Sequence, residues 1–127
     1  KKAGESWASG NWDAYLSCYA DTAKSIHNAW AVTTDTTVAR KVSSYIDMFK
    51  KSREGMDGNV TINNSIYEVV TMADGSKYGH AWVDCSWKTK KGETCKTVIF
   101  NSYSIKDGKL TTEWPIYDTK EFDKLLK

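Results

Sequence analysis

The sequence lacks the features expected of a membrane span, a metal centre or a disulfide framework. Its 127 residues include one proline and three cysteines. The longest apolar runs are only a few residues, whereas a transmembrane helix needs about 20. Cys18, Cys85 and Cys95 are odd in number and show no C-x-x-C spacing. We therefore expect no membrane span, no zinc site and no rich set of disulfides.

Charge and phosphate-binding motifs are also sparse. The formal charge of +2 is too small for a strongly basic nucleic-acid binder, and no Gly-rich phosphate loop is present. With 40% hydrophobic and 13% aromatic residues, the chain is predicted to be one soluble globular domain over residues 1–127, without a cofactor. Because it starts with Lys1, both a cytoplasmic protein and one exported after removal of an N-terminal segment stay open.

The first half of the chain contains helix signals. Residues 2–9 read as the remnant of a first helix that breaks at Gly10. Asn11 can cap a second helix with an apolar stripe of Trp12, Tyr15, Leu16 and Tyr19. A short strand at about 24–30 should contain His27. Residues 34–55 then predict the clearest helix, which Asp35 caps and whose stripe consists of Val38, Val42, Tyr45, Ile46 and Phe49.

From residue 60 the apolar period changes from helical to two, which is typical of strands. Turn signals at 73–76, 88–93 and 106–109 separate four such runs, so a four-stranded antiparallel meander is predicted. A last short helix over 118–127 has Asp118 as its cap and Phe122, Leu125 and Leu126 as its buried side. The order of elements predicts an α+β fold, with helices on one face of a curved antiparallel sheet.

Turn positions predict which side chains share a face of this sheet. A two-residue turn at Asp107 and Gly108 places Asn101 opposite Trp114, and a symmetric turn near residue 90 places Cys85 opposite Cys95. The more apolar face then collects Ala81, Val83, Cys85, Trp87, Thr97, Ile99, Asn101, Tyr103, Leu110, Thr112 and Trp114. This face should meet the helices, so Asn101 would face a polar network or a cavity. A single bulge would exchange parts of these assignments.

Three further expectations depend on the same register. Cys85 and Cys95 are either a disulfide in an oxidising compartment or two small hydrophobic residues. Glu68, opposite Ala81 if Asp74 and Gly75 form a two-residue turn, would place a carboxylate on the inner face. The outer face carries an apolar patch suited to a dimer interface, which consists of Trp82, Val98 and Phe100.

The segments "ASGNWDAYLSCYADTAKSIHNAW" and "YSIKDGKLTTEWPIYD" resemble the nuclear transport factor 2-like superfamily, especially its SnoaL-like polyketide cyclase and ketosteroid isomerase-like branch. The resemblance in organisation covers nearly the whole chain. It implies a cone-shaped α+β fold, a bent sheet wrapped around a pocket, and homodimerisation through the convex face of the sheet. The superfamily includes isomerases, cyclases, dehydratases and epoxide hydrolases, and also binding modules without chemistry.

The resemblance also implies site residues. His27 falls where the isomerases place their carboxylate base, and Asn101 falls near their buried acid that donates to the oxyanion. The oxyanion tyrosine would lie at about Ala3, so a steroid isomerase mechanism is not expected. His27 can move protons near neutral pH, and Asn101 can hold a substrate oxygen. The alternative is that both only complete a hydrogen-bond network.

Other residues are candidates for ligand contact. Glu68 is a candidate acid or base, although such a residue more often lies near a sheet edge. Aromatic side chains suit a small hydrophobic ligand and are otherwise plain core; the candidates are Tyr15, Tyr19, Trp30, Trp87, Tyr103 and Trp114. Two hypotheses follow: a cofactor-independent acid/base enzyme on a small cyclic or carbonyl substrate, and a non-catalytic binding or dimerisation module. A transport adaptor is a weaker third.

Overall fold

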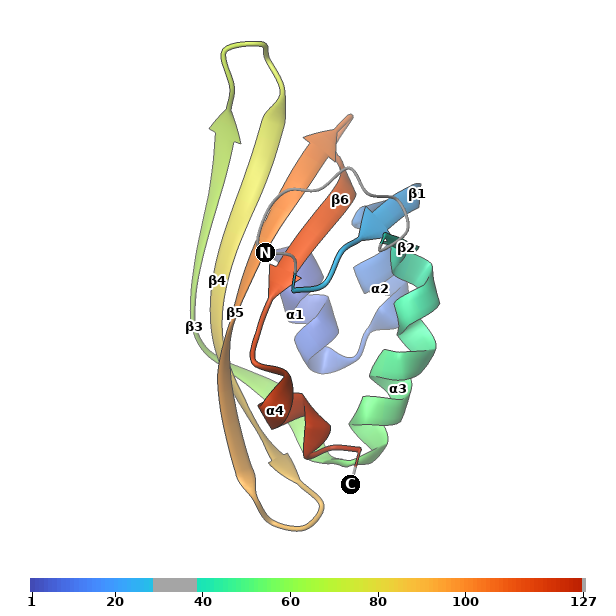
Figure 1. Ribbon diagram of the computed structural model, residues 1–127, viewed down its shortest axis with the longest axis vertical. Helices are drawn as coiled ribbons and strands as arrows, with labels where there is room; N and C mark the ends of the chain where they lie inside the picture. Colours follow the sequence, from blue (N-terminus) through green and yellow to red (C-terminus); the bar gives the residue numbers. More distant parts are fainter. Residues whose placement is uncertain (29–38, 127) are drawn as a thin grey trace.

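The computed structural model describes residues 1–28 and 39–126, in which helices pack on one side of a curled sheet (Figure 1). The helices are α1 (Lys2–Ser9), α2 (Trp12–Leu16), α3 (Ile46–Glu54) and α4 (Thr119–Asp123), and a 3-10 turn, η1 (Val42–Tyr45), precedes α3. The α+β prediction is confirmed. None of the described helices is long and apolar enough to cross a membrane.

The described residues form one six-stranded sheet in the order β2-β1-β6-β5-β4-β3. Its strands are β1 (Tyr19–Ser25), β2 (Arg40–Lys41), β3 (Met56–Thr71), β4 (Lys77–Thr89), β5 (Thr94–Lys106) and β6 (Lys109–Ile116). The predicted four-stranded meander is β3 to β6. Strand β1 adds to β6 in parallel, and every other pairing is antiparallel.

Local sequence signals set the boundaries of the N-terminal helices. Helix α1 ends at Gly10, whose φ of 72° suits a residue without a Cβ. The Asn11 side chain then accepts a hydrogen bond from the backbone N–H of Ala14 and caps α2. Helix α2 is shorter than predicted, because Tyr19 already belongs to β1. The predicted strand at 24–30 is wrong in position: β1 ends at Ser25, and His27 lies in the turn that follows.

The predicted helix over 34–55 is also too long at its start. Arg40 and Lys41 pair with β1 as a two-residue strand, and regular α-helix begins only at Ile46. Asp35, predicted to cap this helix, lies outside the described residues. At the other end of the chain, the Asp118 side chain caps α4 by accepting a hydrogen bond from the N–H of Lys120.

The hairpin between β4 and β5 differs from the prediction by two residues. Lys88 pairs with Thr94, so the loop is centred on residue 91 and Cys85 faces Thr97 instead of Cys95. A shift of two leaves every side chain on its predicted face, because strand side chains alternate with period two. Cys85 and Cys95 are both fully buried and free, so the structure contains no disulfide between them.

The hairpin between β5 and β6 contains the bulge that matters most. The pairing is as predicted at Ile105 and Leu110, but Ser104 then pairs with Thr112, so Thr111 is an extra residue in β6. Because side chains alternate between the two faces, one extra residue places the later side chains of β6 on the face opposite to the predicted one. Glu113 therefore points to the concave side of the sheet, and Trp114 does not, contrary to the prediction.

The core has two parts on the concave side. One packs sheet against α1 and the C-terminal segment and consists of Ala8, Met56, Val60, Ala81, Val83, Cys85, Trp87, Cys95 and Leu125. The other packs α1, α2, β1 and the start of α3 and consists of Ala3, Tyr15, Tyr19, Ala23, Val42 and Ile46. Leu126, predicted to be buried, is 58% exposed. The space between the two clusters is the candidate site.

Candidate functional site

A cavity of about 230 Å³ lies between the helices and the concave face of the sheet. An apolar cavity of about 150 Å³ is large enough for benzene, so this space suits a molecule of one or two rings. The strands supply Tyr19, Tyr67, Ala81, Val83, Ile99, Asn101, Tyr103, Glu113 and Pro115. The helices supply mostly apolar and aromatic side chains, among them Trp7, Trp12, Tyr15, Phe49 and Phe122.

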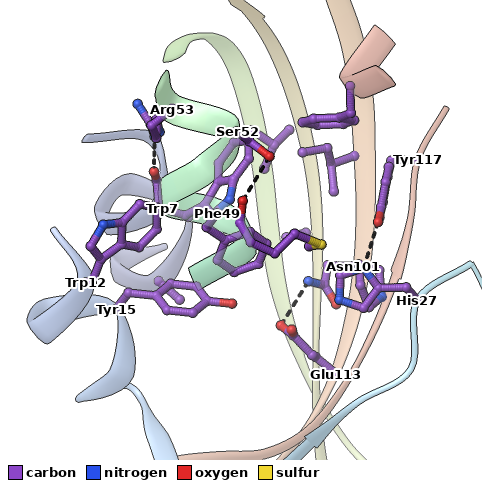
Figure 2. A pocket seen from close by; sticks show the side chains of 18 of the residues that line it. Trp7, Trp12, Tyr15, His27, Phe49, Ser52, Arg53, Asn101, Glu113 and Tyr117 are labelled. Atoms are coloured by element: carbon purple, nitrogen blue, oxygen red, sulfur yellow. Dashed lines mark hydrogen bonds between the residues drawn. The ribbon is translucent and has the colours of Figure 1, made fainter. Parts of the chain in front are cut away.

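The Glu113 carboxyl group is the most unusual feature of the cavity wall. The bulge in β6 turns it inward, and the residue is only 3% exposed. The Tyr19 hydroxyl donates to its Oε2 over 2.6 Å and the Ser25 hydroxyl donates to its Oε1 over 2.8 Å. The Asn101 amide also donates to Oε2, over 3.3 Å (Figure 2). Three neutral donors thus hold a buried carboxyl group.

This environment shifts the protonation of Glu113. Burial raises the pKa of Glu113 above its ordinary value of 4.5, and the hydrogen bonds from Tyr19, Ser25 and Asn101 oppose that shift only in part. Burial and the nearby Glu113 also raise the pKa values of Tyr15, Tyr19 and Tyr103, so these hydroxyls stay protonated as donors. Such a carboxyl group can both accept and release a proton closer to neutral pH.

A hydroxyl relay leads from Glu113 toward α2. The Tyr15 and Tyr19 hydroxyl oxygens lie 3.3 Å apart, and their rings are in contact with centroids 5.0 Å apart. The Tyr19 hydroxyl has a single proton, which it donates to Glu113. Tyr15 is therefore the donor in the hydrogen bond between the two tyrosine hydroxyls. Both tyrosines line the cavity, as does Tyr103.

His27 lies on the β6 side of the cavity. Backbone bonds from Ile26 to Glu113 and from Asn28 to Pro115 hold its turn against β6. The His27 Nδ1 and the Tyr117 hydroxyl oxygen lie 2.7 Å apart (Figure 2). The imidazole stacks on the Tyr45 ring with centroids 4.2 Å apart.

Burial lowers the pKa of His27 to about 4. The imidazole is therefore neutral at pH 7, and either nitrogen can carry its single proton. The Nε2 atom is buried and has no hydrogen-bond partner in the part of the chain that the structure describes. If the Tyr117 hydroxyl donates to Nδ1, then Nε2 carries the proton and is a free donor.

Asn101 is buried on the concave face, as predicted, and it lines the cavity. Its Nδ2 donates to Glu113, whereas its Oδ1 is buried and has no partner among residues 1–28 and 39–126. The Tyr67 hydroxyl, on β3 across the cavity floor, is likewise buried, and no described residue bonds to it.

Not every predicted ligand residue reaches the cavity. Trp114 is turned away from it by the bulge in β6, and Trp30 lies outside the described residues. Glu68 pairs with His80 instead of Ala81, because the register between β3 and β4 is shifted by one residue from the predicted one. Its carboxylate therefore lies on the convex face, where Oε1 is 2.8 Å from the His80 Nδ1. The prediction of an inward Glu68 is wrong.

Sequence reasoning missed Glu113, Tyr67 and Tyr117. The signal for Glu113 was indirect: a carboxylate inside the last strand, in a stretch where one bulge would exchange the two faces. Within residues 1–28 and 39–126, no group of three His, Cys, Asp or Glu side chains is placed to hold a metal ion.

Comparison with known proteins identifies the fold. No protein-family model matches the sequence, and no curated protein sequence matches it. Among solved structures, IdmH of Streptomyces antibioticus, a candidate polyketide cyclase, superposes with a TM-score of 0.68 at 13% identity, covering 98% of this chain and 93% of IdmH. The chain has the nuclear transport factor 2-like fold.

Other solved proteins of the nuclear transport factor 2-like fold support the same conclusion. One from Anabaena variabilis has a TM-score of 0.65 at 11% identity, and the match covers 90% of this chain and 79% of the Anabaena protein. A candidate polyketide cyclase from Xanthomonas campestris has a TM-score of 0.64 at 13% identity, and the match covers 98% of this chain and 91% of the cyclase. The resemblance found in the two sequence segments is thus confirmed over the whole fold.

Proposed function

We propose that this protein is a cofactor-independent acid/base enzyme of the SnoaL-like kind, of the isomerase, cyclase or hydrolase type, which acts on a small cyclic or carbonyl substrate in the cavity. The observation that carries the proposal is Glu113, a buried carboxyl group with a raised pKa in the wall of a largely apolar cavity. A buried carboxylate costs stability, so its presence beside a cavity favours a functional role. The polyketide cyclase assignments of fold neighbours are consistent with this chemistry.

In the proposed reaction Glu113 takes a proton from carbon next to a substrate carbonyl. The C–H bond breaks, its electron pair moves onto the carbonyl oxygen, and the proton goes to a Glu113 carboxylate oxygen. Returning that proton to a different carbon completes an isomerisation. Alternatively, the enolate carbon attacks a second carbonyl, the C–O π electrons of that carbonyl move onto its oxygen, and Glu113 returns the proton to the resulting alkoxide, which completes a cyclisation. Tyr19, Ser25 and Asn101 stabilise the ionised carboxylate between turnovers.

His27 and Tyr117 serve the oxygen end of the substrate. A neutral imidazole whose Nδ1 accepts from Tyr117 presents Nε2–H to the developing enolate oxygen. With a pKa of about 4, His27 acts as this neutral donor and not as the base.

The test follows solvent deuterium entering a panel of small cyclic ketones and aldehydes by proton NMR, which detects enolisation without knowledge of the product. The wild type should accelerate exchange for at least one compound. Glu113→Gln should slow it by about 100-fold or more, the range of general-base contributions. Glu68→Gln, on the convex face, is the matched control and should exchange at the wild-type rate. Exchange that is unchanged in Glu113→Gln would refute the role of Glu113.

A second candidate function is a ligand-binding or dimerisation module without chemistry. The observation in its favour is that both Glu113 oxygens already accept hydrogen bonds and the residue is 3% exposed. Binding of a panel compound, seen as a thermal shift, with no exchange in any compound would favour this function.

The convex face supports the further proposal of a homodimer. Paired positions on β3, β4, β5 and β6 form one apolar row, which we call the convex row: Ile66, Trp82, Phe100 and Ile116. Ile66 is 59% exposed and Trp82 is 38% exposed, and Val98, one step along β5, is 55% exposed. A second copy would remove this surface from water.

A further inference from the structure

One row of side chains crosses the floor of the cavity from strand to strand. Tyr67 pairs with Ala81, Ala81 with Asn101 and Asn101 with Pro115, and all four line the cavity. Strands lie about 4.8 Å apart, so Tyr67 and Asn101 are separated by roughly 10 Å of backbone. Because the residue between them is alanine, only a methyl group projects from β4 between the two side chains.

Tyr67 and Asn101, which lie on either side of Ala81 in this row, offer opposite hydrogen-bonding groups. Asn101 commits its Nδ2 to Glu113, so its unpartnered Oδ1 can only accept a hydrogen bond. The unpartnered Tyr67 hydroxyl carries a proton and can donate. Gly4 faces that hydroxyl, and a Cβ there would come within 3.3 Å of the Tyr67 oxygen. Buried polar atoms without partners are rare, and two such atoms among the described residues of one cavity wall, on strands separated by one strand, indicate a ligand that joins them.

The Asn101 end has a second group. His27 lies against β6 beside Pro115, the neighbour of Asn101 in the row, and its Nε2 is also unpartnered. A ligand hydroxyl suits this end, because it can donate to Asn101 Oδ1 and accept from Nε2–H at once.

The charges around the cavity favour a neutral ligand. Arg53 is the one Arg or Lys in the described lining, and its Nη2 donates to the carbonyls of Trp7 and Ala8 at the end of α1. Its guanidinium also lies over the Trp7 and Trp12 rings. This cation is used within the fold, and Glu113 would repel a carboxylate or phosphate at the floor.

We propose that Tyr67, Ala81 and Asn101 form a recognition row for a flat, neutral ring compound with a hydroxyl at one end and a carbonyl at the other. The hydroxyl donates to Asn101 Oδ1, the ring lies over Ala81, and the carbonyl accepts from the Tyr67 hydroxyl. This inference rests on the proposed function only in taking the same cavity as the ligand site, and it names the substrate class: hydroxylated aromatic or enolised carbonyl compounds of one ring.

The test measures binding of four probes by ligand-observed NMR: 4-hydroxyacetophenone, acetophenone, 4-ethylphenol and ethylbenzene. Each hydrogen bond should tighten Kd by about five-fold, so 4-hydroxyacetophenone should bind about 25-fold tighter than ethylbenzene. In Tyr67→Phe, the acetyl compounds should lose their advantage over the ethyl compounds while the phenols keep theirs. In Asn101→Leu, the phenols should lose their advantage over the compounds without a hydroxyl, while the acetyl compounds keep theirs over the ethyl compounds. Each comparison is made within one variant, so a general loss of affinity does not mimic it.

Ala81→Val tests the floor directly. The added methyl groups should weaken binding of all four probes by at least ten-fold, whereas Cys85→Val, on the same face of β4 but outside the cavity lining, should not. Equal affinities for the four probes, or an acetyl advantage that survives in Tyr67→Phe, would overturn the recognition row. These are binding readouts, so they stand apart from the deuterium exchange test: probes can bind as described without exchange, and exchange can occur without this preference.

Discussion

The two faces of the sheet each carry a glutamate and a histidine, in opposite settings. On the concave face Glu113 is 3% exposed, three donors hold it, and His27 is partly buried nearby. On the convex face Glu68 and His80 contact each other directly, with side chains 49% and 27% exposed. Water screens the outer pair but not the inner groups. The same residue types are therefore held by buried hydrogen bonds on one face and contribute little to stability on the other.

The largest difference in stability between the two faces should appear when the carboxylate of each face is removed. Glu113→Ala leaves the Tyr19 and Ser25 hydroxyls and the Asn101 amide without their acceptor and should lower the free energy of unfolding by about 3–5 kcal/mol. Glu68→Ala removes an exposed pair and should change it by less than about 1 kcal/mol. Urea denaturation at pH 7 measures both. Similar losses in the two variants would contradict the contrast between the faces.

His27 should make the free energy of unfolding depend on pH. Its folded pKa, about 4, lies below the ordinary 6.5, so the unfolded chain binds more protons between these values. This contribution is fully present above pH 6.5 and is lost as the pH falls toward 4, at most about 3 kcal/mol. His27→Gln should flatten this part of the stability profile, and His80→Gln should retain it. A profile in His27→Gln identical to that of the wild type would show that His27 titrates normally.

A single donor to Glu113 should have a smaller effect. Tyr19→Phe removes the hydroxyl that donates over 2.6 Å and keeps the ring. The expected loss is about 1.5–3 kcal/mol of unfolding free energy, typical of a hydrogen bond to a charged group, and the pKa of Glu113 should rise further. In the double variant with Glu113→Gln the loss should shrink, since the accepting charge is gone. Strictly additive losses would mean that the two groups do not interact.

The smallest change in stability should come from the convex face. Val98→Lys, opposite Asp84, should alter the free energy of unfolding by less than about 0.5 kcal/mol. It should nevertheless convert a dimer to a monomer in sedimentation velocity, because the charge enters the proposed interface. Val69→Lys, on the opposite face of the sheet and 65% exposed against 55% for Val98, is the control. A monomeric wild type would refute the dimer.

The fold was predictable from the sequence because turns and periodicity are local signals. Asp107 and Gly108 have φ of 53° and 73°, as the Asp-Gly hairpin signal requires, and the Asn101 side chain lies on its predicted face. The error of two residues between β4 and β5 left the faces unchanged.

The centre of the site was not predictable in the same way. An error of one residue turned Glu68 outward, and the extra Thr111 turned Glu113 inward. Bulges depend on how two strands fit together over their whole length, and no residue near Thr111 encodes one by itself. His27 reached the cavity from a turn and not from the strand predicted for it, because its backbone neighbours bond to β6.

The most direct test of the account is the pKa of Glu113, measured by NMR titration of the carboxyl carbons in protein labelled with ¹³C-glutamate. Glu113→Gln identifies the signal, and added 4-hydroxyacetophenone reports whether a ligand shifts it. The account predicts a midpoint above the ordinary 4.5, since burial outweighs the three hydrogen bonds. A midpoint at or below 4.5 would mean that Glu113 is a hydrogen-bonded structural carboxylate and would contradict its role as the proton carrier.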